Sequence, residues 1–252
     1  VQAKEFILPK ELLEQDCVIS LSKMKTHALE RITGAVKNSY GFIYGFHKAK
    51  GHTQYPSADS FARMLIDLNK CVAPKLYVMD GIVAMEGNGP GSGDPVPMNV
   101  LLMSTDPVAL DSVFSRLVYL KPEMVPTNYH GEKMGLGTWK EEEITLLTPD
   151  GEISMAEAVK KYGNPAFKVD RTEVRKNIWT RMAGALNIFQ KKPYIEADKC
   201  VRCGICVQSC PVPGKAVDFR KGKGKPPVYD YRKCIRCFCC QEMCPKKAIK
   251  VK

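Results

Sequence analysis

The sequence lacks the features of several common protein classes. No apolar run in its 252 residues approaches the roughly 20 residues that a transmembrane helix needs, so we expect no membrane span. It shows no secretory leader, although it starts at Val1 rather than at a methionine. Neither a GxGxxG nor a GxxxxGK pattern is present, so no nucleotide site is expected. The dense basic run at 220–225 has no interleaved aromatic residues, which argues against nucleic-acid binding.

Cysteine and net charge are both scarce in the first three quarters of the chain. Residues 1–190 contain 22 Lys and Arg, balanced by 22 Asp and Glu, and only two of the 11 cysteines. Residues 191–252 contain 16 basic and 5 acidic residues, so the net charge of +11 lies entirely there. Eight of the cysteines in this tail form two regular quartets. Such regularity is typical of metal or cluster ligation in a reducing compartment rather than of disulfides.

The two quartets have the same internal spacing and lie 34 residues apart. Each follows the pattern C-x2-C-x2-C-x3-C-P, and Arg202 and Arg236 repeat with it. The first three cysteines of such a loop hold one [4Fe-4S] cluster, and the cysteine before proline holds the other cluster. We therefore expect cluster I to be held by Cys200, Cys203, Cys206 and Cys244, and cluster II by Cys234, Cys237, Cys240 and Cys210.

A pair of structural zinc sites is the alternative, since C-x2-C also occurs in zinc proteins. Zinc has no use for a third cysteine followed by Cys-Pro, so the pattern favours iron–sulfur clusters. The second quartet departs from the first at Phe238, where the first has Gly204, and at Cys239, an extra thiol. Across residues 193–252 the chain resembles two-cluster bacterial-type ferredoxins, which implies a small α+β domain that transfers electrons at low potential.

The rest of the chain alternates strand-like and helical stretches. The pattern predicts strands at 17–22, 75–80, 98–104 and 143–151, and helices at 57–72, 106–120, 154–162 and 172–189. Ser57 and Asp106 are the expected N-caps of two of these helices. Such alternation is typical of a layered α/β domain with a mainly parallel sheet. We assign residues 1–170 to this domain, 171–192 to a linking helix and 193–252 to the ferredoxin-type domain.

In sheets of this kind, ligands bind beyond the carboxyl ends of strands. Three polar stretches are predicted to lie there: residues 22–41, 80–95 and 104–111. The first combines cations, hydroxyls and a glycine before a helix, which suits an anion. The candidate anion ligands are Lys23, Lys25, His27, Thr33, Lys37 and Asn38. The candidate catalytic residues are His27, Lys37 and Glu86. Each stretch also has a structural interpretation: Asp106 as a helix cap, the glycines of 80–95 as a mobile loop, and the lysines as surface charge.

Several short pieces of this part are similar to one known family. They are "KMKTH", "TGAVKNSYG", "DGIVAMEGNGPGSG" and "STDPVALD", within about residues 12–120. They resemble the domain-of-unknown-function family numbered 362, in which an iron–sulfur tail is frequent. The resemblance implies an α/β domain of anaerobic, cytoplasmic bacteria or archaea, without an agreed reaction. It also implies a family domain that begins upstream of Val1, so the sheet is expected to be N-terminally incomplete.

Two functions are compatible with these features, and a third is possible. In the first, the protein relays single low-potential electrons to a site on the α/β domain or to a partner, and its basic tail suits an acidic redox protein. In the second, it is an oxidoreductase that acts on a small carboxylate or phosphate, although no flavin or nicotinamide motif is visible. Metallocofactor assembly is a third function, which no particular residue supports. We prefer electron transfer, because the clusters are the only chemistry that the sequence specifies. The basic run at 220–225 can equally be a solvated hairpin tip.

Overall fold

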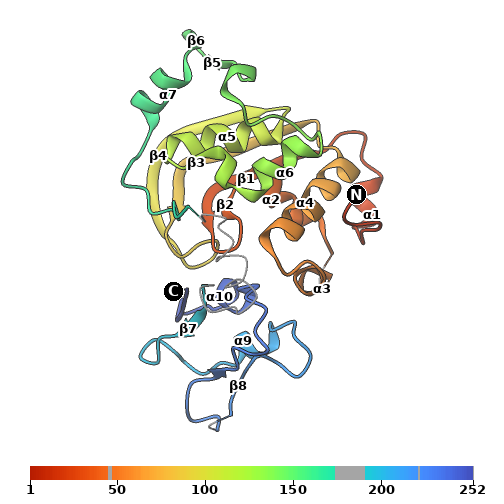
Figure 1. Cartoon of the computed structure of the whole chain (residues 1–252), viewed down its shortest axis with the longest axis vertical. Coiled ribbons are helices and arrows are strands. Elements are labelled where there is room, and N and C mark those ends of the chain that lie inside the picture. Colours follow the sequence, from red (N-terminus) through yellow and green to blue (C-terminus); the bar gives the residue numbers. More distant parts are fainter. Residues whose placement is uncertain (45–46, 174–190, 221, 252) are drawn as a thin grey trace, which may run out of the picture.

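The larger part of the molecule is built on a four-stranded β-sheet. The computed structural model describes residues 1–44, 47–173, 191–220 and 222–251 (Figure 1). The strands lie in the order β2-β1-β3-β4, with bounds β1 (Ile19–His27), β2 (Arg31–Thr33), β3 (Leu76–Glu86) and β4 (Asp94–Ser104). β1 and β3 extend past the predicted strand ends. In β1 every second side chain continues to be buried, whereas in β3 the alternation is interrupted at Ile82 and Val83, where the pairing with β4 shifts register.

The sheet is mixed, so the expectation of a mainly parallel sheet is wrong for the described strands. β1 pairs in parallel with β3, starting with Ile19 opposite Leu76. β2 pairs antiparallel with β1, and β4 pairs antiparallel with β3. β2 follows β1 and β4 follows β3 after a short turn, and strands joined by a short turn pair antiparallel because a parallel pair needs a long crossover connection. Residues 22–41 and 80–95, expected as loops beyond the strand ends, are therefore largely parts of two hairpins.

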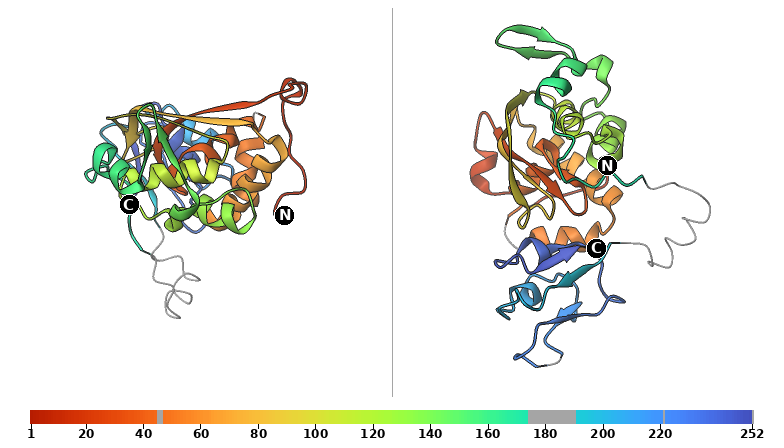
Figure 2. Two further views of the ribbon diagram at one scale, coloured as in Figure 1. Left: turned by 90° about the horizontal axis from the view of Figure 1, so that it is seen from above. Right: turned by 90° about the vertical axis from the view of Figure 1, so that its left-hand side faces the viewer.

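Helices cover one face of this sheet (Figure 2). α4 (Ala58–Val72) starts after Ser57, whose hydroxyl accepts a hydrogen bond from the backbone N–H of Ser60. α5 (Pro107–Leu117) starts after Asp106, whose carboxylate accepts two backbone N–H bonds. Both predicted N-caps are confirmed. The shorter helices are α1 (Lys10–Leu13), α2 (Ala35–Asn38), α3 (His47–Gln54) and α6 (Pro126–Lys133), and the 3-10 turns are η1 (Ser39–Phe42), η2 (Pro122–Met124) and η3 (Glu141–Glu143).

Two buried apolar clusters hold these layers together. One surrounds Met24 of the sheet and Phe114 of α5, and the other surrounds Phe61 of α4. On the opposite face of the sheet the side chains are open to solvent, with Leu21 72% and Met103 63% exposed. The described sheet is thus covered by helices on one face only.

A small extension follows the sheet domain. β5 (Leu146–Thr148) and β6 (Gly151–Ile153) form a hairpin, and α7 (Met155–Tyr162) follows with Ser154 as its N-cap. The helix predicted at 154–162 is confirmed, and the strand and turn predicted at 143–151 correspond to β5 and the turn that leads to β6. The predicted linking helix at 171–192 falls mainly on residues 174–190, which lie outside the described residues.

The cysteine-rich part repeats one small unit twice. β7 (Pro193–Ile195) pairs with β10 (Ile249–Val251), and β8 (Val217–Asp218) pairs with β9 (Val228–Tyr229). α9 (Ile205–Gln208) and α10 (Cys239–Glu242) begin at the same point of each quartet. The residues just before them, Gly204 and Phe238, have positive φ angles of 78° and 60°. The duplication therefore extends to the backbone, and the second half makes the left-handed turn without glycine.

Candidate functional site

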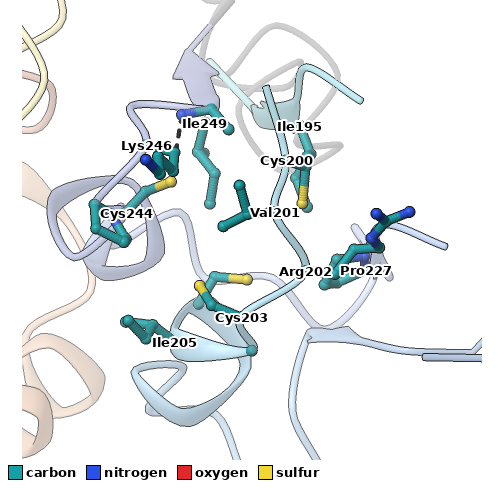
Figure 3. Close-up of a pocket in the computed structure, with 14 residues that line it drawn as sticks. Ile195, Cys200, Val201, Arg202, Cys203, Ile205, Pro227, Cys244, Lys246 and Ile249 are labelled. Carbon is teal, nitrogen blue, oxygen red and sulfur yellow. Dashed lines mark hydrogen bonds between the residues drawn. The ribbon is translucent and has the colours of Figure 1, made fainter. Parts of the chain in front are cut away.

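Four cysteines drawn from both quartets line one pocket (Figure 3). Cys200, Cys203 and Cys206 come from the first quartet, and Cys244 comes from the second. The close-up places Cys244 on one side of the pocket and Cys200 on the other, with apolar Val201 between them and Cys203 below. Convergent thiols in an apolar surrounding are what a [4Fe-4S] cluster needs, so these residues fit the predicted cluster I.

The remaining four quartet cysteines also lie together. Burial raises the pKa of Cys234, and the charges of Cys237 and Cys210 raise it further. Burial likewise raises the pKa of Cys240, with smaller contributions from Cys237 and Cys234. This set fits the predicted cluster II, in which the first quartet supplies Cys210. Among the described residues, no three His, Cys, Asp or Glu are grouped closely enough to hold a single metal ion.

A backbone hydrogen bond to the last sulfur of each quartet repeats between the two halves, whereas a side-chain bond from Tyr229 does not. The Cys210 Sγ accepts the backbone N–H of Ala216 at 3.3 Å, and the Cys244 Sγ accepts that of Ala248 at 3.3 Å. The Tyr229 hydroxyl donates to the Cys240 Sγ at 3.1 Å. Donors aimed at cluster sulfurs stabilise the reduced, more negative state. The Tyr229 bond has no counterpart, because the residue 34 positions earlier is isoleucine.

The extra thiol of the second half, Cys239, lies within the site. A hydrogen bond from the Cys239 thiol lowers the pKa of Cys237, and the same contact raises the pKa of Cys239. Cys240, in contrast, accepts the bond from Tyr229 and lies near the other cysteines of its set. Both thiols thus lie near the predicted cluster II set, and the choice of Cys240 over Cys239 continues to rest on the duplicated spacing. Cys17 and Cys71 are exposed and free.

The glycine-rich turn between β3 and β4 contacts the ferredoxin-type part through hydrogen bonds. The Gln241 side chain donates from Nε2 to the carbonyl of Asn88 at 2.7 Å and to that of Gly89 at 3.2 Å. The Asn88 side chain donates to the carbonyl of Ile249 at 3.0 Å. A Cβ at Gly91 would lie 2.7 Å from the backbone oxygen of Glu242, so this approach requires glycine. The glycine-rich part of the stretch at 80–95, predicted as a ligand loop or alternatively as a mobile loop, is therefore a contact surface for α10 and β10.

His27 lies at the same contact and is buried. Its Nδ1 accepts backbone N–H bonds from Leu29 and Glu30, both at 3.1 Å. The opposite nitrogen, Nε2, therefore carries the proton and donates it to Glu242 at 2.9 Å. Burial and the charge of Lys37 lower the pKa of His27 to about 4. The imidazole is thus a neutral bridge between the end of β1 and α10.

Several further ionisable groups surround this bridge. We call the group the interdomain polar cluster, with members Lys25, His27, Glu30, Lys37, His52 and Glu242. Lys37 is central, since its charge shifts the pKa of each of the other five. Burial is the largest influence on Lys25, whose pKa is lowered, and Lys37 lowers it further. With His27, His52 and Glu30 neutral, the two lysines outweigh the Glu242 carboxylate, so the cluster has a small net positive charge beside the second cysteine quartet.

Two buried members of this cluster have unused hydrogen-bonding atoms. Both carboxyl oxygens of Glu30 and the Nδ1 of His52 have no hydrogen-bond partner among the described residues. Burial raises the pKa of Glu30 well above its ordinary value, which favours the neutral acid. The His52 ring stacks on Phe61 at 4.5 Å, and burial lowers its pKa to about 4. These atoms are available to a ligand or to ordered water.

The remaining candidate anion ligands do not share one site. Lys23 forms an ion pair with Asp80 at 2.5 Å, and both side chains are half-exposed. The Asn38 side chain donates to the carbonyl of Leu21 at 3.0 Å, so it links the end of α2 to the backbone of β1. Thr33 is opposite Lys25 in the β1–β2 pair and is buried, with no hydrogen-bond partner for its hydroxyl among the described residues. Of the six candidates, Lys25, His27 and Lys37 are thus brought together.

The acidic residues of the predicted ligand stretches have structural partners. Glu86 is buried and accepts from the backbone N–H of Lys168 at 2.9 Å, and also pairs with the Lys168 ammonium at 3.1 Å. Asp106 caps α5. Asp111 is buried at the start of α2, where its carboxylate accepts the backbone N–H groups of Ala35 and Val36. Burial raises the pKa of Asp111 to about 7. These carboxylates therefore support local structure, and Asp111 holds the start of α2, the helix that carries Lys37.

Sequence reasoning missed Glu30, His52 and Glu242. Glu30 stands between the motif residues His27 and Thr33 and could have been included with them. Glu242 carried a usable signal, because it replaces Gln208 of the first repeat. The sequence gives no signal for His52, since its position in the cluster depends on how α3 packs against α4.

Comparison with known proteins follows the same division of the chain. Residues 192–245 match a 4Fe-4S dicluster domain, so the carboxyl-terminal part is of the iron–sulfur type. Residues 1–116 match the domain of unknown function DUF362. The chain thus combines these two regions, and the resemblance expected from the sequence is confirmed. The dicluster match supports the binding of [4Fe-4S] cofactors.

One curated relative covers part of this chain. The thylakoid-associated protein sll1697 of Synechocystis sp. (strain ATCC 27184 / PCC 6803 / Kazusa) is 42% identical over 130 residues, which are 51% of this chain and 40% of the relative. The chain therefore spans less than half the length of that relative. No solved structure matches the chain. Within the described ranges, no helix is both long and apolar enough to cross a membrane.

Proposed function

We propose that this protein transfers single electrons through two [4Fe-4S] clusters toward the interdomain polar cluster. Cluster I would be held by Cys200, Cys203, Cys206 and Cys244, and cluster II by Cys234, Cys237, Cys240 and Cys210. The clusters supply one-electron chemistry, and this chain's own residues position and tune them. We retain the cytoplasm, which the family resemblance implies, as the expected location.

The observation that carries this proposal is the seating of the second quartet against the α/β domain. Glu242, two residues before Cys244, meets His27 at 2.9 Å, and Gln241 is bound by the glycine-rich turn. Cys237 and Cys239 are near enough to Tyr40 that their charges raise its pKa, although burial is the larger cause. Electrons at cluster II would therefore be next to Lys25 and Lys37.

The test is anaerobic reconstitution followed by iron analysis and electron paramagnetic resonance of the dithionite-reduced protein. We expect about eight irons per chain and the signals of two magnetically coupled reduced clusters. About four irons, or zinc in place of iron, would overturn the two-cluster assignment.

A second candidate function is reduction of a small anion at the interdomain polar cluster. The observation that favours it is the pair of cations, Lys25 and Lys37, which make no hydrogen bond or ion pair within the described residues. The buried acid Glu30 could donate to a carboxylate or phosphate held between them. We assign Glu86 a structural role, because Lys168 already occupies both of its oxygens. A two-electron reaction here would need a further cofactor or partner.

Replacing His27 and Lys37 with alanine separates the two functions. If the protein is an electron carrier, the double variant should still be reduced by dithionite and still exchange electrons with an external redox protein through its clusters. If it is an oxidoreductase, the variant should lose turnover of its anion with intact clusters. A panel of small carboxylates and phosphates, added to the reduced wild type, provides the substrates. Reoxidation by one of them would favour the enzyme.

A further inference from the structure

The second half of the repeat is covered by the α/β domain, while the matching surface of the first half is open. Gln241 and Glu242 of α10 contact the glycine-rich turn and His27. Their counterparts 34 residues earlier are Val207 and Gln208 of α9, and Gln208 is exposed. In Figures 1 and 2, α10 lies next to the α/β domain and α9 on the side away from it. One of two equivalent surfaces thus already serves as a contact site.

The open surface has a small apolar centre at the edge of the first cysteine set. Val201 is 52% exposed and Ile205 is half-buried, and both line the pocket that Cys200, Cys203 and Cys206 share. Cys203 itself is exposed, whereas its counterpart Cys237 is buried. An apolar centre next to an exposed ligand sulfur would let a partner approach cluster I closely.

Cations surround this centre. Arg202 and Lys246 line the same pocket, and its described lining includes no acidic residue. Arg202 donates to the carbonyl of Gly224 at 3.1 Å, which ties the exposed Lys223 and Lys225 to the same side. Apolar residues within a ring of like charges are typical of transient redox interfaces, in which charge steers association.

We propose that this cluster I face, defined as Val201, Arg202, Ile205, Lys223, Lys225 and Lys246, docks an acidic electron-transfer protein. The proposal rests on the proposed function, since docking here gives access to cluster I. It fixes an order of contacts: the external partner meets the first half, and the α/β domain meets the second. It also gives the basic run at 220–225 a role beyond that of a solvated hairpin tip.

The test uses the reconstituted full chain and an acidic flavodoxin as the probe. Binding is measured by surface plasmon resonance at an ionic strength of about 20 mM and again at about 300 mM. We expect the Lys223→Glu/Lys225→Glu variant to weaken binding at low salt by about tenfold or more, and Arg202→Glu to do the same. The difference from wild type should shrink at high salt, where surface charges are screened.

The matched control is Lys160→Glu on α7, an exposed lysine at the opposite end of the molecule. It should bind flavodoxin almost as wild type does. The proposal is overturned if the control weakens binding as much as the lysine variants, if none of them does, or if wild type does not bind. Tighter binding of a DNA duplex than of flavodoxin to the same residues would also overturn it. Iron content and dithionite reduction are measured on each protein. Loss of these in wild type would count against electron transfer itself and not against docking.

Discussion

The two halves of the cysteine repeat share a backbone but differ in their surroundings. In the first half, Arg202 and Cys203 are exposed. In the second, Arg236 is 7% exposed and Cys237 is 7% exposed. The same ligand pattern therefore presents one set of cysteines to solvent and the other to protein. Duplication supplied two equivalent sites, and docking against the α/β domain made them unequal.

One group of sequence differences between the halves lies where this contact is made. Gly204, Ile205, Val207 and Gln208 of the first half are replaced by Phe238, Cys239, Gln241 and Glu242. Phe238, Cys239 and Gln241 are buried, and Gln241 and Glu242 bond directly to the α/β domain. Departures from an internal repeat thus indicate an interface, which is information that a single sequence contains.

The largest expected effect comes from replacing the cysteine that each half is predicted to donate to the cluster of the other half. Cys244 belongs to the second quartet but lines the pocket of the first, so Cys244→Ser should remove cluster I and leave about four irons in cluster II. Cys210→Ser should remove cluster II instead. Iron analysis and electron paramagnetic resonance after flavodoxin binding would identify the surviving cluster, because cluster I lies at the proposed docking face.

Cys239→Ala is the control for these substitutions. Its thiol contacts Cys237 but belongs to neither predicted set, so both clusters should remain. If Cys244→Ser instead removed the cluster beside the α/β domain, the crossed assignment would be wrong.

Acid should loosen the second half and not the first. The pKa of His27 is about 4 in the folded protein, against an ordinary 6.5, because of burial and Lys37. Unfolded or undocked protein therefore binds more protons between these values, so the stability of docking is full above pH 6.5 and is lost as pH falls toward 4. Going from pH 7 to pH 5 should cost about 2 kcal/mol for this imidazole. Hydrogen exchange of α10, corrected for intrinsic rates, measures the loss.

His27→Gln is the matched variant for the acid effect. Glutamine keeps a donor for Glu242 but has no proton to gain, so part of the pH dependence should disappear. His52, whose pKa burial also lowers to about 4, contributes a loss of stability in the same pH range, and Glu30, whose pKa burial raises, contributes with the opposite sign. Exchange of α9 should not change with pH, because no His contacts it among the described residues. Equal loosening of α9 and α10 would contradict the role of His27.

A smaller effect is expected from adding one methyl group at the contact. A Cβ at residue 91 would meet the Glu242 oxygen at 2.7 Å, so Gly91→Ala should push α10 away at a cost of about 1–3 kcal/mol. Gly224→Ala, beside the first half, is the control, because its Cβ would meet nothing within 4 Å. Faster exchange of α10 in the first variant alone would sharpen the comparison, and unchanged exchange in both would weaken it.

Local signals in the sequence were sufficient for some features and not for others. Ser57 and Asp106 were predictable as caps because a cap depends on residues within one turn. The grouping of Cys244 with the first quartet was predictable from the spacing rule. The mixed sheet was not, because the extent of β1 and β3 depends on burial by helices from elsewhere in the chain. His27 was singled out correctly as a polar residue of interest, but its partner Glu242 lies 215 residues away.

The smallest expected effect concerns a hydrogen bond that only the second half has. Tyr229 donates to the Cys240 Sγ at 3.1 Å, whereas the equivalent residue of the first half is Ile195, which has no donor to offer. A donor stabilises the extra negative charge of a reduced cluster, so this bond should raise the potential of cluster II relative to cluster I. Tyr229→Phe should therefore lower the cluster II potential by about 20–40 mV, the equivalent of a modest hydrogen bond of about 0.5–1 kcal/mol, while cluster I keeps its value. Redox titration followed by electron paramagnetic resonance measures both potentials.

Delivery of electrons from an external donor to the α/β domain requires a downhill step from cluster I to cluster II. If the potential of cluster II did not respond to the Tyr229→Phe substitution, this argument for the direction of electron flow would be removed.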